Sequence, residues 1–140
     1  MSRFLLDTNI LVYVILADFD NLSDEIKDIL LDYESQLYTS SISVLELLQL
    51  HRIKKIQIKK YKTATEVYHA IENEFYIKIL PFAKQHTETL SKLKIADNHN
   101  DPFDHSIISQ AITEQLILIS SDRKFEKYTD QKLNFLFNKR

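Results

Sequence analysis

The sequence RFLLDTNILVYVILA, residues 3–17, has the pattern of a strand joined to a helix through one acid. Residues 3–7 form a short, nearly continuous apolar run, which is typical of a strand buried on both faces of a parallel sheet. From residue 9 to residue 17 the apolar side chains follow helical periodicity. The stretch therefore predicts a strand that passes directly into a helix, with Asp7 at the junction.

The same alternation of strand and helix continues along the chain. Further strands are predicted at 36–40, 76–81, 116–121 and 133–137. Helices are predicted at 23–34, 42–58, 61–75, 83–95 and 102–114, with a short turn near 123–128. Strands that alternate with helices form a parallel sheet with helices on both faces. We expect one α/β domain over residues 1–140, an α/β/α sandwich with about five parallel strands.

The composition limits the classes of protein to which this chain can belong. A length of 140 residues with 44% hydrophobic content allows one domain with a full core. Glycine is absent, which excludes the phosphate-binding loops of P-loop and Rossmann sites. Cysteine is also absent, which excludes disulfides and thiolate metal sites. No apolar run approaches a membrane span, so we expect a soluble, cytoplasmic protein that does not bind membranes.

Two acids stand where predicted strands end. Asp7 follows the first strand, and Asp122 follows the fourth in LILISSD, residues 116–122. In an open parallel sheet, ligands bind outside the carboxyl ends of the strands. Each acid could instead cap the helix or turn that follows it. For each residue taken alone, both interpretations stay open.

The segment DNHNDPFDHSIISQA, residues 97–111, contains a third candidate. Asp101 before Pro102 has the pattern of an N-cap at a helix start. Asp104 then falls on the apolar stripe of that helix, where a charge is costly unless something neutralises or coordinates it. Because Asp104 starts the helix that feeds the fourth strand, we place it at the opposite end of that crossover. A loop that folds back would then have to bring it to the other acids.

A fourth acid, Glu46, interrupts the apolar sequence SVLELLQL, residues 43–50. Ile42, Leu50 and Ile53 share its helix face. Glutamate is rarely buried without a partner, so Glu46 alone fits a solvent-facing position as well as a site. The combination of all four acids favours a site.

Four motifs in order, LLDTNILVY, SISVLELLQL, HNDPFDHSIISQA and LILISSDRKF, resemble those of PIN-domain ribonucleases. The resemblance is strongest to the VapC-like toxins of bacterial type II toxin–antitoxin pairs, and it extends from residue 4 to about residue 128. It implies a doubly wound parallel sheet and an acidic cluster that binds Mg²⁺ or Mn²⁺. The residues that match this cluster are Asp7, Glu46, Asp104 and Asp122.

Several neighbouring residues also match the family. Thr8 and Ser120 match hydroxyl positions, while His99 and Asp101 match positions common in members that carry DPFD, which implies supporting roles. Those members usually have arginine after the third acid, whereas this chain has His105. A histidine could contact phosphate or pair with a carboxylate in place of that arginine only when protonated.

The expected chemistry is metal-assisted hydrolysis of RNA phosphodiester bonds by an endoribonuclease. Asp7 and Asp104 would be direct metal ligands, and Glu46 and Asp122 would orient water or hold a second ion. The resemblance also implies a cognate antitoxin protein, laid across residues 18–34 and neighbouring helices, and a homodimer. Core packing explains most of the apolar side chains in 18–34.

Other classes of function fit less well. A non-catalytic PIN-like module that binds RNA or protein would keep the fold and usually lose one acid, but all four are present. A HAD-type phosphotransferase needs an aspartate two residues after the first, where this chain has Asn9. A receiver domain needs a lysine at the end of its last strand, and Lys139 comes after the sheet is expected to end.

The segment HRIKKIQIKKYK, residues 51–62, has six Lys or Arg in a chain of net charge −2. It can be a solvated helix end, where cations are favoured by the helix dipole. It can also be a surface that follows RNA phosphates, with Tyr61 stacked on a base. The sequence leaves both interpretations open.

Overall fold

The five predicted strands pair in one parallel sheet in the computed structural model, which describes residues 2–139. They are β1 (Arg3–Leu6), β2 (Gln36–Ser40), β3 (Ile77–Leu80), β4 (Ile117–Ser120) and β5 (Asn134–Phe137). Their spatial order is β3-β2-β1-β4-β5, so the direction of winding reverses between β1 and β4. Such a reversal leaves a crevice at the carboxyl ends of the two strands. Asp7 directly follows β1 and Ser120 ends β4, so both lie at this crevice.

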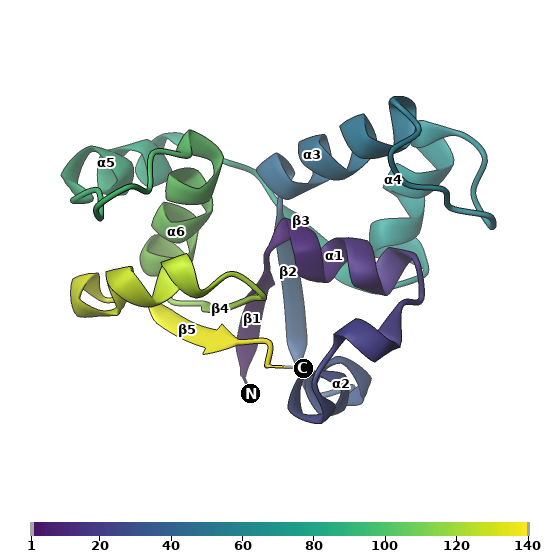
Figure 1. Cartoon of the computed structure of the whole chain (residues 1–140), viewed down its shortest axis with the longest axis horizontal. Coiled ribbons are helices and arrows are strands. Elements are labelled where there is room, and N and C mark those ends of the chain that lie inside the picture. Colours follow the sequence, from purple (N-terminus) through teal and green to yellow (C-terminus); the bar gives the residue numbers. More distant parts are fainter. Residues whose placement is uncertain (1, 140) are drawn as a thin grey trace.

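The helices cover both faces of the sheet (Figure 1). They are α1 (Thr8–Ile15), α2 (Asp24–Leu31), α3 (Ser41–Arg52), α4 (Ala64–Asn73), α5 (Lys84–Lys92) and α6 (Pro102–Glu114). Two 3-10 segments, η1 (Phe19–Asn21) and η2 (Arg123–Gln131), complete the regular structure. The expected α/β/α sandwich is confirmed.

The central strand β1 joins the two cores because its side chains alternate between the faces. Phe4 and Leu6 pack in one core with α1, α2, α3 and α4. Leu5 points to the other face and packs with α6 and η2. All three side chains are buried. The continuous apolar run that predicted this strand is therefore a consequence of burial on both faces.

The helix predicted over 42–58 is wrong at its end, because α3 stops at Arg52. Lys54 adopts a left-handed conformation with φ of 63°, which an α-helix does not continue through. The backbone N–H groups of Lys54 and Lys55 turn back to the carbonyl oxygens of His51 and Leu50. Residues 53–63 consequently form a loop between α3 and α4.

The expected position of Asp104 at the far end of its crossover is also wrong. A helix that connects two parallel strands runs antiparallel to them, so its first turn lies at their carboxyl ends. Asp104 is in the first turn of α6, whose end feeds β4. The crossover itself therefore brings Asp104 to the edge of the sheet that carries Asp7.

Within residues 2–139, no helix combines the length and the apolar character needed to cross a membrane.

Asn138 ties the end of β5 to two other parts of the fold. Its side chain is 2% exposed, and its Oδ1 accepts a hydrogen bond from the Ser23 N–H at 2.8 Å. Its Nδ2 donates to the Asn21 carbonyl at 2.7 Å and to the Ser121 hydroxyl at 2.8 Å. The loop before α2 and the loop after β4 are thus held by one amide.

We expect Asn138→Ala to lower the free energy of unfolding by about 2–4 kcal/mol, because it leaves buried polar groups unpaired. Urea denaturation measures this change. Asn134→Ala, on the exposed side of the same strand, is the matched control and should stay within about 0.5 kcal/mol of the wild type. Equal losses in the two variants would contradict the proposed role of the amide.

Candidate metal centre

Asp7 is the most buried of the four predicted site acids, with 5% of its surface exposed. One carboxylate oxygen caps α1 by accepting a hydrogen bond from the Thr8 N–H at 2.8 Å. The other oxygen accepts from the Ser120 hydroxyl at 2.6 Å and from the Asn9 amide at 3.1 Å. Asp7 is therefore both a helix cap and a residue of the crevice, so the two interpretations of the sequence do not exclude each other.

Burial raises the pKa of Asp7 from 3.8 to about 7. The hydrogen bonds from Ser120 and Thr8 oppose this rise because they favour the charged form. The neighbouring carboxylates of Asp104 and Glu46 add to it by repulsion. A group with this pKa is half protonated near neutral pH, and a bound cation would favour its ionised form.

Glu46 faces the same crevice from α3. Its Oε1 accepts a hydrogen bond from the Thr8 hydroxyl at 2.7 Å, and the residue is partly buried. Burial raises the pKa of Glu46, the Thr8 hydroxyl lowers it, and the carboxylates of Asp101 and Asp104 raise it further. Glu46 is therefore directed at the crevice and not into solvent, and its part in a metal site stays a prediction.

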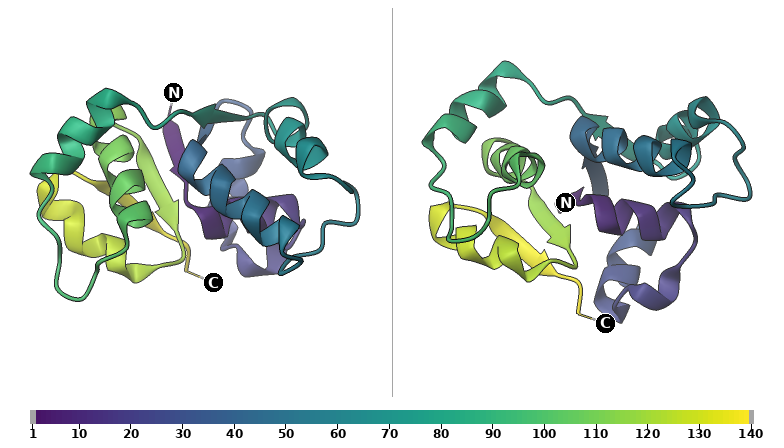
Figure 2. Two further views of the ribbon diagram at one scale, coloured as in Figure 1. Left: turned by 90° about the horizontal axis from the view of Figure 1, so that it is seen from above. Right: turned by 45° about the horizontal axis from the view of Figure 1, so that its top comes forward.

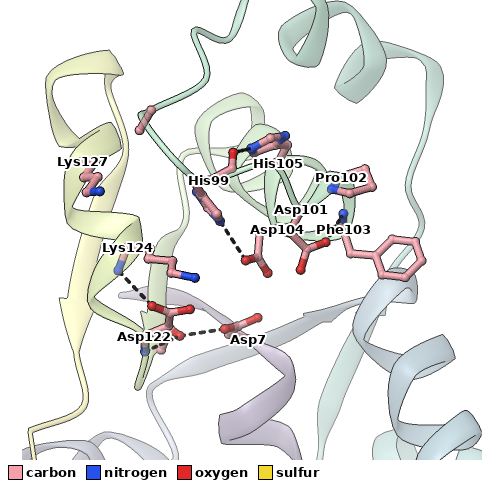
Figure 3. A network of polar contacts seen from close by, with 12 residues as sticks. Asp7, His99, Asp101, Pro102, Phe103, Asp104, His105, Asp122, Lys124 and Lys127 are labelled. Carbon is pink, nitrogen blue, oxygen red and sulfur yellow. Dashed lines mark hydrogen bonds and ion pairs between the residues drawn. The ribbon is translucent and has the colours of Figure 1, made fainter.

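Asp104 lies across the crevice from Asp7 and is held by His99 (Figure 3). The distance from His99 Nε2 to Asp104 Oδ2 is 2.9 Å, and 20% of the Asp104 side chain is exposed. Burial raises the pKa of Asp104, the His99 contact lowers it, and the carboxylates of Asp101 and Asp122 raise it. The charge on the apolar stripe of α6 therefore has a partner.

The hydrogen-bond chain behind Asp104 favours one position for the hydrogen of the neutral His99 ring. The Ala96 N–H donates to the Tyr128 hydroxyl at 3.1 Å, which leaves the hydroxyl hydrogen free to donate elsewhere. That hydroxyl lies 2.8 Å from His99 Nδ1. If Tyr128 donates to Nδ1, the hydrogen of the neutral ring is on Nε2 and is directed to Asp104. Tyr128 has no signal in the sequence motifs, so its part in the site was missed.

His105 does not take the place of the arginine that the resemblance leads one to expect. Its side chain is buried, and its Nε2 lies 2.8 Å from the His99 carbonyl oxygen, to which it donates. Its ring packs edge-on against that of His99, with centroids 5.0 Å apart. His105 thus supports the backbone of His99 and points away from the acids (Figure 3).

Asp122 and Asp101 complete the acidic edge. Asp122 caps η2 through the Lys124 N–H at 2.9 Å, and its own N–H donates to the Ser120 hydroxyl. Its carboxylate points toward the space between Asp7 and Asp104 (Figure 3). Asp101 caps α6 through the Phe103 N–H at 2.9 Å, as predicted. Its negative charge also raises the pKa of Glu46 and of Asp104. Asp101 therefore contributes to the electrostatics of the crevice as well as capping α6.

The donor set suits a hard divalent cation held largely through water. All four predicted ligands are carboxylates, and Mg²⁺ takes oxygen ligands and keeps several waters, with one or two protein carboxylates. Within residues 2–139, no three His, Cys, Asp or Glu side chains are close enough to enclose an ion by themselves. Carboxylate oxygens alone are donors of the kind that Mg²⁺ prefers, and water and substrate phosphate commonly complete its ligand shell.

The PIN domain family matches residues 4–131, so the chain belongs to the PIN-domain family, whose members are typically nucleases. Its fold is similar to that of a chain of VapBC2 from Rickettsia felis, bound to a promoter DNA fragment. The TM-score is 0.67 with 22% identity, over 96% of this chain and 98% of that chain. A chain of VapBC-1 from nontypeable Haemophilus influenzae has a TM-score of 0.63 and 19% identity, over 96% of this chain and 97% of that chain.

A third similar structure is DNA-bound VapBC from Salmonella typhimurium, with a TM-score of 0.63 and 17% identity over 98% of both chains. No curated protein sequence matches the chain. The predicted resemblance is confirmed for the family and the fold.

The raised pKa of Asp7 predicts how stability depends on pH in the absence of divalent cations. Asp7 ionises near pH 3.8 when unfolded and near pH 7 when folded. Between these values the folded chain holds the additional proton, so the free energy of unfolding falls as pH rises from about 4 to about 7. The loss attributable to Asp7 is up to about 4 kcal/mol.

Asp7→Asn should remove most of this loss. The free energy of unfolding of the variant, relative to that of the wild type, should therefore be higher at pH 8 than at pH 4. Urea denaturation at several pH values measures the difference. Asp97→Asn, in an exposed turn, should behave like the wild type. An Asp7→Asn variant that loses as much stability as the wild type would show that Asp7 ionises normally.

The hydrogen-bond chain predicts the effect of Tyr128→Phe. The wild-type His99 ring should have its hydrogen on Nε2, and the variant should lose this preference because Nδ1 has no donor. Nitrogen NMR of the ring measures the hydrogen position, and Mn²⁺ affinity should fall by roughly tenfold. Tyr76→Phe, at a residue 80% exposed, is the matched control. An unchanged ring spectrum in Tyr128→Phe would contradict the assignment.

Proposed function

We propose that the protein is a metal-dependent endoribonuclease that hydrolyses RNA phosphodiester bonds. The observation that carries this proposal is Asp7, buried at the reversal point of the sheet with a pKa of about 7 and acids on neighbouring elements around it. Such crowding of carboxylates is costly without a cation to offset the repulsion. Membership of the PIN-domain family supports the same activity and a general dependence on metal.

The four acids have different roles in this proposal. Asp7 and Asp104 would be the direct ligands of the cation, while Glu46 and Asp122 would orient water or hold a second ion. A bound Mg²⁺ or Mn²⁺ would supply a more acidic water and offset charge on the phosphate oxygens. Thr8 keeps Glu46 directed at the crevice through its hydroxyl.

The residues around the acids maintain their charge and orientation. Ser120 donates to Asp7 and accepts from the Asp122 N–H, so a single hydroxyl links two of the acids. His99 donates to one oxygen of Asp104 and leaves the other oxygen for a ligand. The site therefore has fixed donors behind the carboxylates and open carboxylate oxygens in front of them.

We also propose that the protein is the toxin of a type II toxin–antitoxin pair, with an antitoxin as its partner. Several of the structures with this fold are toxin–antitoxin complexes. Exposed apolar side chains around α2 give such a partner a surface to cover: Phe19 is 49% exposed and Leu31 is 83% exposed. The expected homodimer stays a prediction.

The purified chain, freed of any partner, should cut bacterial RNA at discrete positions with Mg²⁺ or Mn²⁺ and not with a chelator. Asp7→Asn and Asp104→Asn should each lower the cleavage rate by roughly a hundredfold, because each removes a ligand charge. Gel analysis of the products measures cleavage, and Asp97→Asn should keep full activity. Cleavage that survives both the chelator and the two substitutions would rule the proposal out. Cation binding without cleavage would favour a non-catalytic module.

A further inference from the structure

A cationic hollow of about 630 Å³ lies between the end of α3 and the start of α4. Its charged lining comes from Arg52, Lys54, Lys59 and Lys62, and none of its lining residues is an Asp or Glu. Within residues 2–139, none of these four cations takes part in an ion pair. The hollow therefore gathers four cations without an ion-pair partner among the described residues, in a chain whose net charge is −2.

The loop that carries these lysines is held in place by its apolar residues. Ile58 and Tyr61 are 8% and 6% exposed and belong to the core beneath α3 and α4. The Tyr61 hydroxyl also donates to the Glu74 carboxylate. Because these two side chains point inward, the neighbouring Lys59 and Lys62 are displayed on the surface of an anchored loop.

The same contacts correct one detail of the sequence interpretation. Tyr61 is buried and its ring is not available to an RNA base, so the structure does not support the stacking that one of the two open interpretations included. Lys60 is also occupied, since its ammonium lies 3.1 Å from the Glu74 carboxylate. The cations that remain for a ligand are those of the hollow and its rim.

The hollow and the acidic crevice lie along one helix. Glu46 and Arg52 are separated by six residues of α3, which is about 9 Å along the helix axis. Seen from above, α3 runs from the neighbourhood of β1 toward the loop that joins it to α4 (Figure 2). A polyanion that is bound at the acids through a cation could therefore extend along α3 and reach the hollow with the next few of its repeating units.

We propose that the cationic hollow at residues 52–62 binds the phosphates of the RNA strand beside the bond that is cut. This inference rests on the proposed nuclease function. The chain has no net positive charge to attract RNA as a whole, so local cations must hold the strand. The four acids repel the strand, and the hollow offsets that repulsion at a fixed place, which orients the strand along α3.

The test is the salt dependence of RNA binding. A short, fluorescently labelled single-stranded RNA is titrated at several salt concentrations with the whole protein and a chelator, so that no cleavage occurs. The triple substitution Lys54→Gln, Lys59→Gln, Lys62→Gln should weaken binding at low salt at least tenfold. It should also flatten the slope of log affinity against log salt by about 2, because each lost phosphate contact removes about 0.7.

The matched control is Lys84→Gln, Lys94→Gln, Lys132→Gln, which changes the net charge equally at exposed lysines outside the hollow. It should keep the wild-type slope. Equal effects of the two triple variants, or no effect of either, would overturn the proposal. A polyglutamate peptide is titrated in the same way. If the three hollow lysines are required for binding of this peptide and not for binding of RNA, the proposal is overturned in favour of an acidic protein segment.

The chelator separates this inference from the nuclease proposal. If the hollow lysines set the slope and the wild type cuts no RNA with metal present, the hollow binds RNA phosphates, but the nuclease proposal and the placement beside a cleaved bond both fail. If the wild type cuts RNA and the hollow lysines contribute nothing, the nuclease proposal stands and the RNA strand lies elsewhere.

Discussion

Asp7 is buried between the ends of β1 and β4, and the other residues of the site are arranged around its carboxylate. Burial together with repulsion from Asp104 and Glu46 makes its charged form expensive, and hydrogen bonds from Ser120 and Thr8 offset only part of that cost. The sheet imposes this position, because the reversal of strand order places the end of β1 beside the end of β4. A divalent cation would offset the electrostatic cost of ionising Asp7 in this position.

Each of the other acids comes to the neighbourhood of Asp7 from a different element, so the site forms only when the whole domain is folded. Glu46 comes from α3, Asp104 from the first turn of α6 and Asp122 from the turn after β4. Asp7, Asp122 and Asp101 are at the same time helix caps, which makes local structure and site inseparable. The hydroxyls and His99 behind the acids then decide which carboxylate oxygens stay open.

The sequence predicts the strands, whose positions depend on a local apolar pattern. It does not predict features that depend on contacts between segments distant in the chain. The five strands were placed within two residues of their ends, because continuous apolar runs report burial on both faces. The end of α3 was missed because Lys54 takes a left-handed conformation in a chain without glycine to signal it. The roles of His105 and Tyr128 depend on how the loop before α6 packs against η2, which no motif encodes. The resemblance placed the acids in one site, although only the fold shows which of them is buried.

The number of protons released on cation binding reports directly on the protonation of Asp7. Titration calorimetry with Mn²⁺ at pH 6, in buffers of different ionisation enthalpy, measures how many protons leave the protein. We predict the release of about one proton per bound cation in the wild type, because Asp7 must ionise, and little in Asp7→Asn. Tight binding with no proton release would show that Asp7 is already ionised, and the account of the buried carboxylate would be wrong.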